Sequence, residues 1–202
     1  MAEVKRSGPL RALPEGYQEV LHYRLTEGRR LLWLNVAALI PLALAVLLLD
    51  LWWTAFAGAR APAPAEPLNL PWWTSIAALI VLPLHELVHG GAIALLGHRP
   101  RYGIKLEAGV LFATADGALF RRSEFLVIAL APLVVISLMG MALQLVVYPE
   151  IGRIIAYAVA INAGGAIGDL WTVWLVSRFP SQALVRDEED SFRVFLPAAI
   201  DR

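Results

Sequence analysis

Four long apolar segments constrain the fold of this chain more than any other feature. They cover residues 31–56, 72–96, 124–148 and 151–176. Each is long enough to cross the hydrocarbon core of a bilayer, which takes about 20 helical residues. Hydrophobic residues make up 58% of the chain and charged residues 17%, which is too apolar for a soluble domain of 202 residues. The sequence therefore predicts an all-α integral membrane protein with about four transmembrane helices in a lipid bilayer.

Basic residues predict the orientation of these helices. Most of the Lys and Arg residues lie in the N-terminal segment and in the 97–123 connection. The 57–71 linker contains only Arg60, and the turn between the last two apolar segments contains only Arg153. Cytoplasmic segments of membrane proteins carry an excess of Lys and Arg, so both termini and the 97–123 connection are expected on the cytoplasmic side of a prokaryotic cell membrane. The Ala- and Pro-rich 57–71 linker is then an external strap.

Composition and charge exclude some functions. The net charge is zero, which gives no reason to expect nucleic acid as a partner. There is no cysteine, so disulfides and thiolate metal sites are excluded. The first apolar run is too long for the core of a signal peptide, and no cleaved targeting segment is expected. The chain is expected to divide into an N-terminal segment (1–30), a transmembrane core (31–177) and a C-terminal tail (178–202), in which the acidic run 187–190 forms a solvated face.

The stretch "LHELVHGG" places a His-Glu-x-x-His cluster inside the second apolar segment. His85 and His89 are four residues apart, so on a helix their imidazoles lie on one face and suit two adjacent corners of a metal tetrahedron. In zinc peptidases with this spacing, the residue equivalent to Glu86 holds the attacking water and transfers its proton. The alternative is a pair of polar side chains that neighbouring helices satisfy. Ionisable groups inside spans usually mark function, which favours the metal site.

A catalytic zinc normally takes three protein ligands, so a third must come from elsewhere in the chain. Asp169 is the one carboxylate deep in the fourth apolar segment. His89 and Asp169 each precede the expected cytoplasmic end of their helix by eight residues, which places both about 12 Å from that end. Asp169 is therefore the candidate third ligand, unless it only pairs with a basic residue. His22 and His98 lie in the charged tail and at a helix end, and are poor candidates.

Small and polar residues accompany the candidate ligands. Gly90 and Gly91 follow the second histidine, and Gly164 and Gly168 precede the aspartate, so the helices can approach closely, either to share an ion or for packing alone. Asn162 lies seven residues before Asp169, on nearly the same helical face. It is a candidate substrate-binding residue that donates a hydrogen bond to a carbonyl or an oxyanion. The alternative is a bond to a neighbouring helix.

The 101–119 connection contains two short runs of strand-forming residues, "YGIKL" and "VLFATA", on either side of residues 107–109. They predict a small β-hairpin between the second and third transmembrane helices. The hairpin either binds an unwound substrate backbone or only covers the site. Pro132, inside the third apolar segment, is expected to kink its helix.

These motifs resemble a known family. The "HELVHGG" motif, the connection and span that follow it, the "NAGGAIGDLW" segment and the C-terminal "RFPSQALVRDEEDSFRVFL" are similar to the bacterial and archaeal putative zincin peptidase family, which looks related to the site-2 intramembrane metalloproteases. The resemblance covers about residues 80–196. It implies that His85, His89 and Asp169 bind Zn²⁺ and that Glu86 is the catalytic acid and base. Better known site-2 proteases have an Asn-Pro-Asp-Gly-like sequence where this chain has Gly168-Asp169-Leu170.

The resulting prediction is an intramembrane zinc metalloprotease that hydrolyses peptide bonds in or near transmembrane segments of membrane proteins. Its partners would be a membrane-protein substrate and the lipid bilayer. The alternative is a metal-binding membrane protein without hydrolytic activity, either a degenerate peptidase or a transporter. The polar residues concentrate in one half of the membrane, which favours a closed site over a conduit. A bis-histidine haem site is disfavoured because histidines one turn apart cannot approach a haem from opposite faces.

Overall fold

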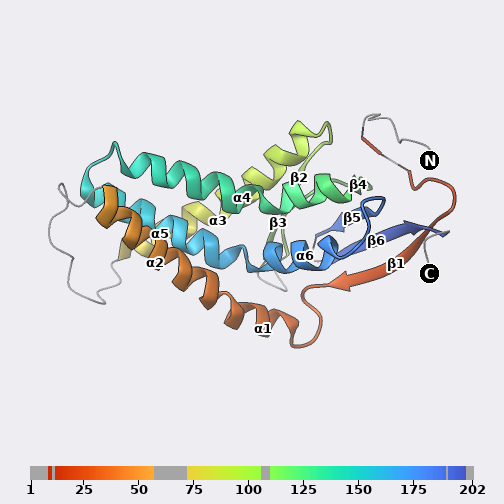
Figure 1. The fold of residues 1–202 in the computed structure, drawn as a ribbon, viewed down its shortest axis with the longest axis horizontal. Helices are drawn as coiled ribbons and strands as arrows, with labels where there is room; N and C mark the ends of the chain where they lie inside the picture. Colours follow the sequence, from red (N-terminus) through yellow and green to blue (C-terminus); the bar gives the residue numbers. More distant parts are fainter. Residues whose placement is uncertain (1–8, 11, 57–71, 106–109, 190, 199–202) are drawn as a thin grey trace.

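The structure, a computed structural model, describes residues 9–10, 12–56, 72–105, 110–189 and 191–198. Figure 1 shows a long bundle of helices with β-strands gathered at one end. The helices are α1 (Arg30–Ala37), α2 (Leu39–Phe56), α3 (Trp72–Leu95), α4 (Arg122–Gln144), α5 (Pro149–Gly165) and α6 (Ile167–Ser177). The strands are β1 (Tyr17–Arg24), β2 (Arg101–Lys105), β3 (Val110–Thr114), β4 (Phe120–Arg121), β5 (Leu184–Glu188) and β6 (Ser191–Pro197).

Three helical stretches in the described residues are long and apolar enough to cross a membrane. They are Arg30–Phe56, which combines α1 and α2, then Ser75–Leu95 and Arg122–Gln144. Large apolar side chains on these helices point away from the protein, including Ile40, Leu79 and Leu138, each more than 60% exposed. Such a surface is stable against lipid rather than water. The fold therefore indicates a membrane protein.

The fourth apolar segment is a bent pair of helices, which corrects the prediction of one continuous span. Helices α5 and α6 meet at an angle of 42°, and only the two together are long and apolar enough to cross a membrane. Ala166 both ends α5 and precedes α6. Gly164, Gly165 and Gly168 surround this position, and glycine weakens a helix because it gains no side-chain contacts and loses more backbone entropy. The break therefore falls where the helix is intrinsically weakest.

Helix α5 lies at the centre of the bundle and contacts α2, α3 and α4. Buried Leu49, Val159 and Ala160 form the contact between α2 and α5. Opposite them, Gly140 of α4 lies so close to Val159 that a Cβ on the glycine would overlap the valine side chain. A glycine at this position thus lets α4 and α5 approach closely, as small residues do in membrane bundles.

The prediction of an all-α fold is wrong, because β1 near the N-terminus, β5 and β6 near the C-terminus, and the short β4 before α4 form a four-stranded antiparallel sheet. Its strand order is β1-β6-β5-β4. The longest pairing joins Tyr17 to Pro197 and continues to Arg24 and Ser191. One face of the sheet packs on the ends of α3, α4 and α6 in a buried cluster that includes Ile93, Phe125, Val176, Val185, Phe192 and Val194. The described residues of the two predicted tails therefore form a sheet that packs against the helices.

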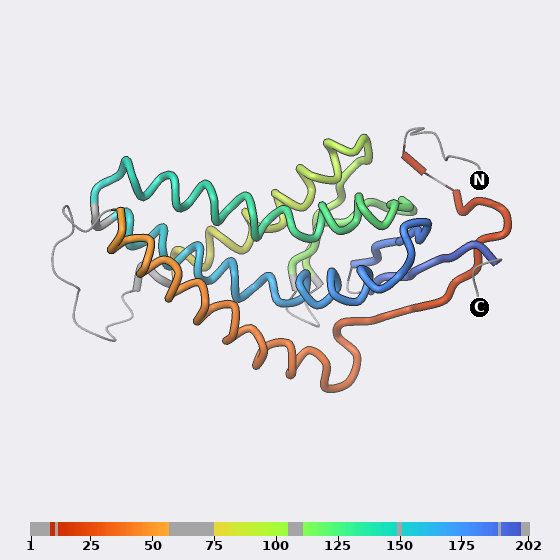
Figure 2. The backbone as a smooth tube through the Cα atoms, viewed as in Figure 1, coloured from red at the N-terminus to blue at the C-terminus, as the bar shows by residue number. Residues whose placement is uncertain are grey.

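The predicted β-hairpin between the second and third apolar segments is confirmed. Strands β2 and β3 pair in antiparallel fashion from Arg101 opposite Thr114 to Lys105 opposite Val110. Residues 107–109, which separate the two predicted strands, lie outside the described residues, as does the 57–71 linker. Strands β1 and β6 and the start of α4 lie at one end of the bundle and the connection of α4 to α5 at the other (Figure 2). The placement of both termini and of the 97–123 connection on the cytoplasmic side stays a prediction.

The sheet core generates a stability prediction. Val194 on β6 is fully buried, whereas Val20 on β1 is 37% exposed. Val194→Ala should lower the free energy of unfolding by about 2 kcal/mol, since each buried methylene contributes about 0.8 kcal/mol and a cavity adds to the loss. The matched change Val20→Ala should cost well under half as much. Thermal unfolding in detergent measures both, and equal losses would contradict the assignment of the sheet's buried face.

Candidate metal centre

The structure brings the three predicted ligands together. His85 and His89 lie one turn apart in the middle of α3, and Asp169 lies in the first turn of α6. His85 Nε2 is 3.0 Å from Asp169 Oδ2, and His89 Nε2 is 3.4 Å from Asp169 Oδ1. Both imidazoles are buried, with 7% and 8% of their surface exposed. The expectation that ligands from two helices share one level of the bundle is therefore met.

The donor set fits a divalent metal. One ligand atom from each residue lies within 4.8 Å of the others. Zinc bonds of about 2.0–2.2 Å in a tetrahedron place neighbouring ligand atoms about 3.3 Å apart, close to the distances between the histidine nitrogens and the carboxylate oxygens. Two imidazoles and one carboxylate suit zinc and leave one position open for water, as in catalytic zinc sites.

The other nitrogen of each imidazole is also bound. His85 Nδ1 lies 2.9 Å from Asn162 Oδ1, and His89 Nδ1 lies 2.9 Å from the carbonyl of Ile128. Both partners are acceptors, so each Nδ1 carries the proton and donates it. The lone pair of each imidazole is then on Nε2, the atom that faces Asp169. Ligand histidines are commonly fixed in this way, by a hydrogen bond from the nitrogen that does not bind the metal.

Asn162 holds this arrangement from α5. Its Nδ2 donates to the carbonyl of Pro132 on α4 at 3.2 Å, which turns its oxygen toward His85. The residue is 1% exposed. Of the two predicted alternatives, the bond to neighbouring helices is present in the structure. The contact of Asn162 with a substrate stays a prediction.

The bend between α5 and α6 places Asp169. The residue follows the break at Ala166 by three positions and lies in the first turn of the new helix. The free N–H groups and the dipole at a helix N-terminus stabilise a negative charge there. The glycines that weaken the helix therefore also set the position of the carboxylate, although Gly168 itself has open space beside it.

Glu86 lies next to the ligands, in the same cavity of about 210 Å³. Ala113 on β3 lines the same cavity. Leu111 and Phe112 line the cavity beside Ala113, so one strand of the hairpin forms a wall of the site. The carboxylate predicted to act on water is thus held at the same cavity as the metal ligands.

Gly90 lets the hairpin approach α3. A Cβ at this position would overlap the ring of Tyr102 from β2. Gly91, the next residue, has nothing within 4 Å of the corresponding point. The close approach at Gly90 is therefore between a helix and a hairpin, whereas the sequence predicted an approach between helices. At Gly164 a Cβ would lie 3.4 Å from the Cβ of Leu42 on α2.

The remaining histidines lie elsewhere. His22 is on β1 opposite Arg193 of β6. The ring of His98 packs 4.8 Å from that of Phe120. Neither belongs to the group of candidate metal ligands in the described residues.

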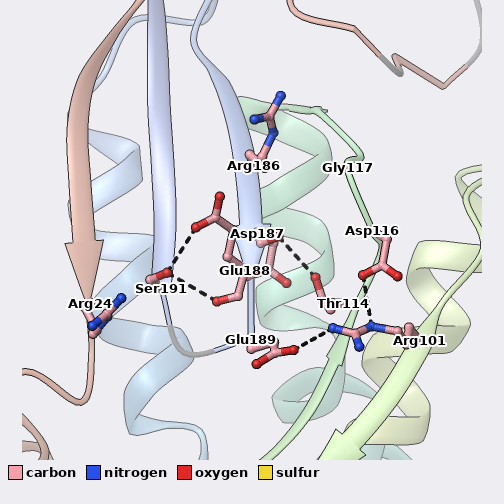
Figure 3. A pocket seen from close by; sticks show the side chains of 10 residues that line it. All are labelled: Arg24, Arg101, Thr114, Asp116, Gly117, Arg186, Asp187, Glu188, Glu189 and Ser191. Atoms are coloured by element: carbon pink, nitrogen blue, oxygen red, sulfur yellow. Dashed lines mark hydrogen bonds and ion pairs between the residues drawn. The ribbon is translucent and has the colours of Figure 1, made fainter.

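Asp187 is a residue near the site that the sequence did not predict. It lies on β5, and it lines both the metal cavity and a second, polar cavity of about 520 Å³. Figure 3 shows this polar cavity, in which Arg101 binds Asp116 at 2.9 Å and Glu189 at 2.6 Å. Asp187 is half-buried where β5 pairs in the sheet, so it does not belong to the solvated face expected for residues 187–190. Burial raises the pKa of Asp187 to about 7.

Comparison with known families places the chain in one of them. Residues 78–184 match the family described as putative zincin peptidase, and the chain belongs to that family. The matched range contains every candidate ligand, Glu86 and Asn162. The family implies a zinc metallopeptidase, in agreement with the donor set of His85, His89 and Asp169. No curated protein and no solved structure is significantly similar to the chain.

The geometry predicts that Asp169 is required for metal binding. Asp169→Ala removes one of three ligands, so the purified variant should lose its zinc while the wild type carries about one zinc per chain. Asp50→Ala is the matched control, because Asp50 is also a carboxylate in an apolar helix but is exposed on α2. Elemental analysis of the three proteins measures the outcome. Zinc retained in Asp169→Ala at the wild-type level would show that the third ligand is another residue.

Asp187 predicts a dependence of stability on pH. A carboxyl group with a pKa of about 7 when folded and about 4 when unfolded stabilises the fold at low pH, and this stability is lost as the pH rises from about 4 to about 7. The groups that face it are Thr114 on β3, His89 and Glu86 on α3, and Asp169 on α6. Asp187→Asn removes the ionisation, so its melting temperature relative to wild type should be higher at pH 8 than at pH 5.

The comparison is made on metal-free protein, so that metal binding does not contribute to the difference. Asp116→Asn is the control, since the Asp116 side chain is 71% exposed and water screens its charge. A difference between Asp187→Asn and wild type that is the same at both pH values would contradict the raised pKa.

Proposed function

We propose that this protein is an intramembrane zinc metalloprotease of the site-2-protease type, which hydrolyses peptide bonds in or beside transmembrane segments of other membrane proteins. The observation that carries the proposal is the meeting of His85, His89 and Asp169, with Glu86 at the same cavity, inside apolar helices. Ionisable groups are costly among lipid-facing helices, and here they converge on one point. Membership of a zincin peptidase family supports the hydrolytic chemistry.

The chain's residues divide the reaction between them. Zinc held by His85, His89 and Asp169 would supply Lewis-acid polarisation of water and of the scissile carbonyl. Glu86 takes a proton from the attacking water while the water oxygen bonds to the scissile carbonyl carbon. The same carboxyl group then gives the proton to the amide nitrogen as the C–N bond breaks, so that a carboxylic acid and an amine leave.

The hairpin offers a place for the substrate backbone. In the described residues β3 pairs with β2 alone, and Leu111, Phe112 and Ala113 of β3 line the metal cavity. A transmembrane helix has to unwind before its amides can be cut, and an extended segment can then pair with a strand edge. We place the substrate alongside β3, with its scissile bond between Glu86 and the metal ligands.

The proposal includes an orientation. The distribution of Lys and Arg supports an orientation with both termini, and hence the sheet, on the cytoplasmic side of a prokaryotic cell membrane. Asp187, Glu189 and Ser191 line both the metal cavity and the polar cavity at this end of the molecule. Water from the cytoplasm would reach the metal along these side chains.

The proposed role of Glu86 predicts a separation of metal binding from cleavage. Glu86→Gln keeps the size of the side chain and leaves all three ligands, so zinc content should be unchanged. The rate of cleavage should fall by about 10²–10⁴-fold, the usual contribution of a general acid or base. The assay uses a library of fluorogenic single-span peptides reconstituted in liposomes with the purified protein.

Glu27→Gln is the control, because Glu27 is an exposed carboxylate that pairs with Arg30 and does not line the cavity. Undiminished cleavage by Glu86→Gln would remove Glu86 from the reaction. Zinc binding by the wild type without cleavage of any peptide in the library would favour a metal-binding protein that does not hydrolyse.

A further inference from the structure

Pro132 lies inside α4, on the side that faces the metal centre. Proline has no backbone N–H, so it cannot donate the helical hydrogen bond to the carbonyl four residues earlier. That carbonyl belongs to Ile128, and it accepts the hydrogen bond from His89 Nδ1 at 2.9 Å. Pro132 and Ile128 are both buried. The carbonyl oxygen in α4 that lacks its helical donor therefore accepts a hydrogen bond from a candidate metal ligand on α3.

The carbonyl one turn further along α4 also accepts a side-chain hydrogen bond. The carbonyl of Pro132 accepts a hydrogen bond from Asn162 Nδ2, and Asn162 Oδ1 accepts one from His85 Nδ1. One turn of α4, from Ile128 to Pro132, thus orients both histidines. It binds His89 directly and His85 through Asn162.

We propose that Pro132 is a positioning residue of the metal centre. By leaving the Ile128 carbonyl free, it fixes the proton of His89 on Nδ1 and turns Nε2 toward Asp169. The inference rests on the proposed metallopeptidase function, and it gives the proline a role beyond a kink in the helix. Proline destabilises a helix interior by about 3 kcal/mol. The free carbonyl that it leaves for a ligand histidine gives a functional reason for a proline at this position.

The test restores the missing N–H. In Pro132→Ala the new backbone N–H competes with His89 for the Ile128 carbonyl. Loss of the partner of a ligand histidine typically weakens metal binding by 10–100-fold, so the dissociation constant for Zn²⁺, measured by competition with a chelator, should rise by about that factor. The helix itself is not weakened, since alanine is a better helix former than proline. The variant Pro132→Gly supplies the same N–H and tolerates the existing backbone, and it replaces Pro132→Ala if that variant does not fold.

A spectroscopic readout separates positioning from general damage to the fold. In zinc-loaded protein labelled with ¹⁵N-histidine, the Nδ1–H signal of His89, assigned by its absence in His89→Gln, should move on substitution of Pro132 because its acceptor is lost. Pro83→Ala is the matched control: Pro83 is also a proline inside a helix, but it is exposed on α3. It should leave both the dissociation constant and the His89 signal unchanged.

The outcomes distinguish this inference from the proposed function. If wild-type protein binds no zinc, the proposed function fails. If wild-type protein binds zinc and Pro132→Ala binds it equally well with an unmoved His89 signal, the metal centre stands and the role of Pro132 is overturned. Equal weakening in Pro83→Ala would also overturn it, because the effect would then belong to any helix proline.

Discussion

The contact of two histidines on α3 with one carboxylate on α6 is the interaction on which the rest of the structure depends. His85 and His89 approach Asp169 at 3.0 and 3.4 Å among helices whose outer faces are apolar. Ionisable groups in such surroundings are stable only when they pair or bind an ion. The bundle therefore has to bring α3 and α6 to a fixed distance, and a divalent cation at this point would join them.

The surrounding elements each contribute one constraint to that contact. The break at Ala166 starts a new helix just before Asp169, so the carboxylate lies at a helix N-terminus. A proline in α4 leaves a carbonyl for His89, and Asn162 of α5 connects α4 to His85. The hairpin closes one side of the cavity. The four-stranded sheet packs against the ends of α3, α4 and α6 and holds them together.

The sequence was sufficient for features that depend on local pattern. Apolar runs located the helices, the spacing of His85 and His89 indicated one helical face, and strand-forming runs predicted the hairpin. The sheet could not be predicted in this way, because Tyr17 of β1 pairs with Pro197 of β6 and neither segment alone shows its partner. The surroundings of Asp187 also come from distant parts of the chain, because it shares the metal cavity with residues of α3 and α6. The break at Ala166 did have a local signal in the surrounding glycines, which the apolar pattern obscured.

The most direct measurement of the central claim is X-ray absorption at the zinc edge of the purified, zinc-loaded protein. The account predicts four nitrogen or oxygen neighbours at about 2.0–2.2 Å, with the scattering pattern of two imidazoles from His85 and His89. The other two neighbours would be a carboxylate oxygen of Asp169 and a water. A spectrum with fewer than two imidazoles, or a preparation that takes up no zinc, would contradict a centre built from α3 and α6.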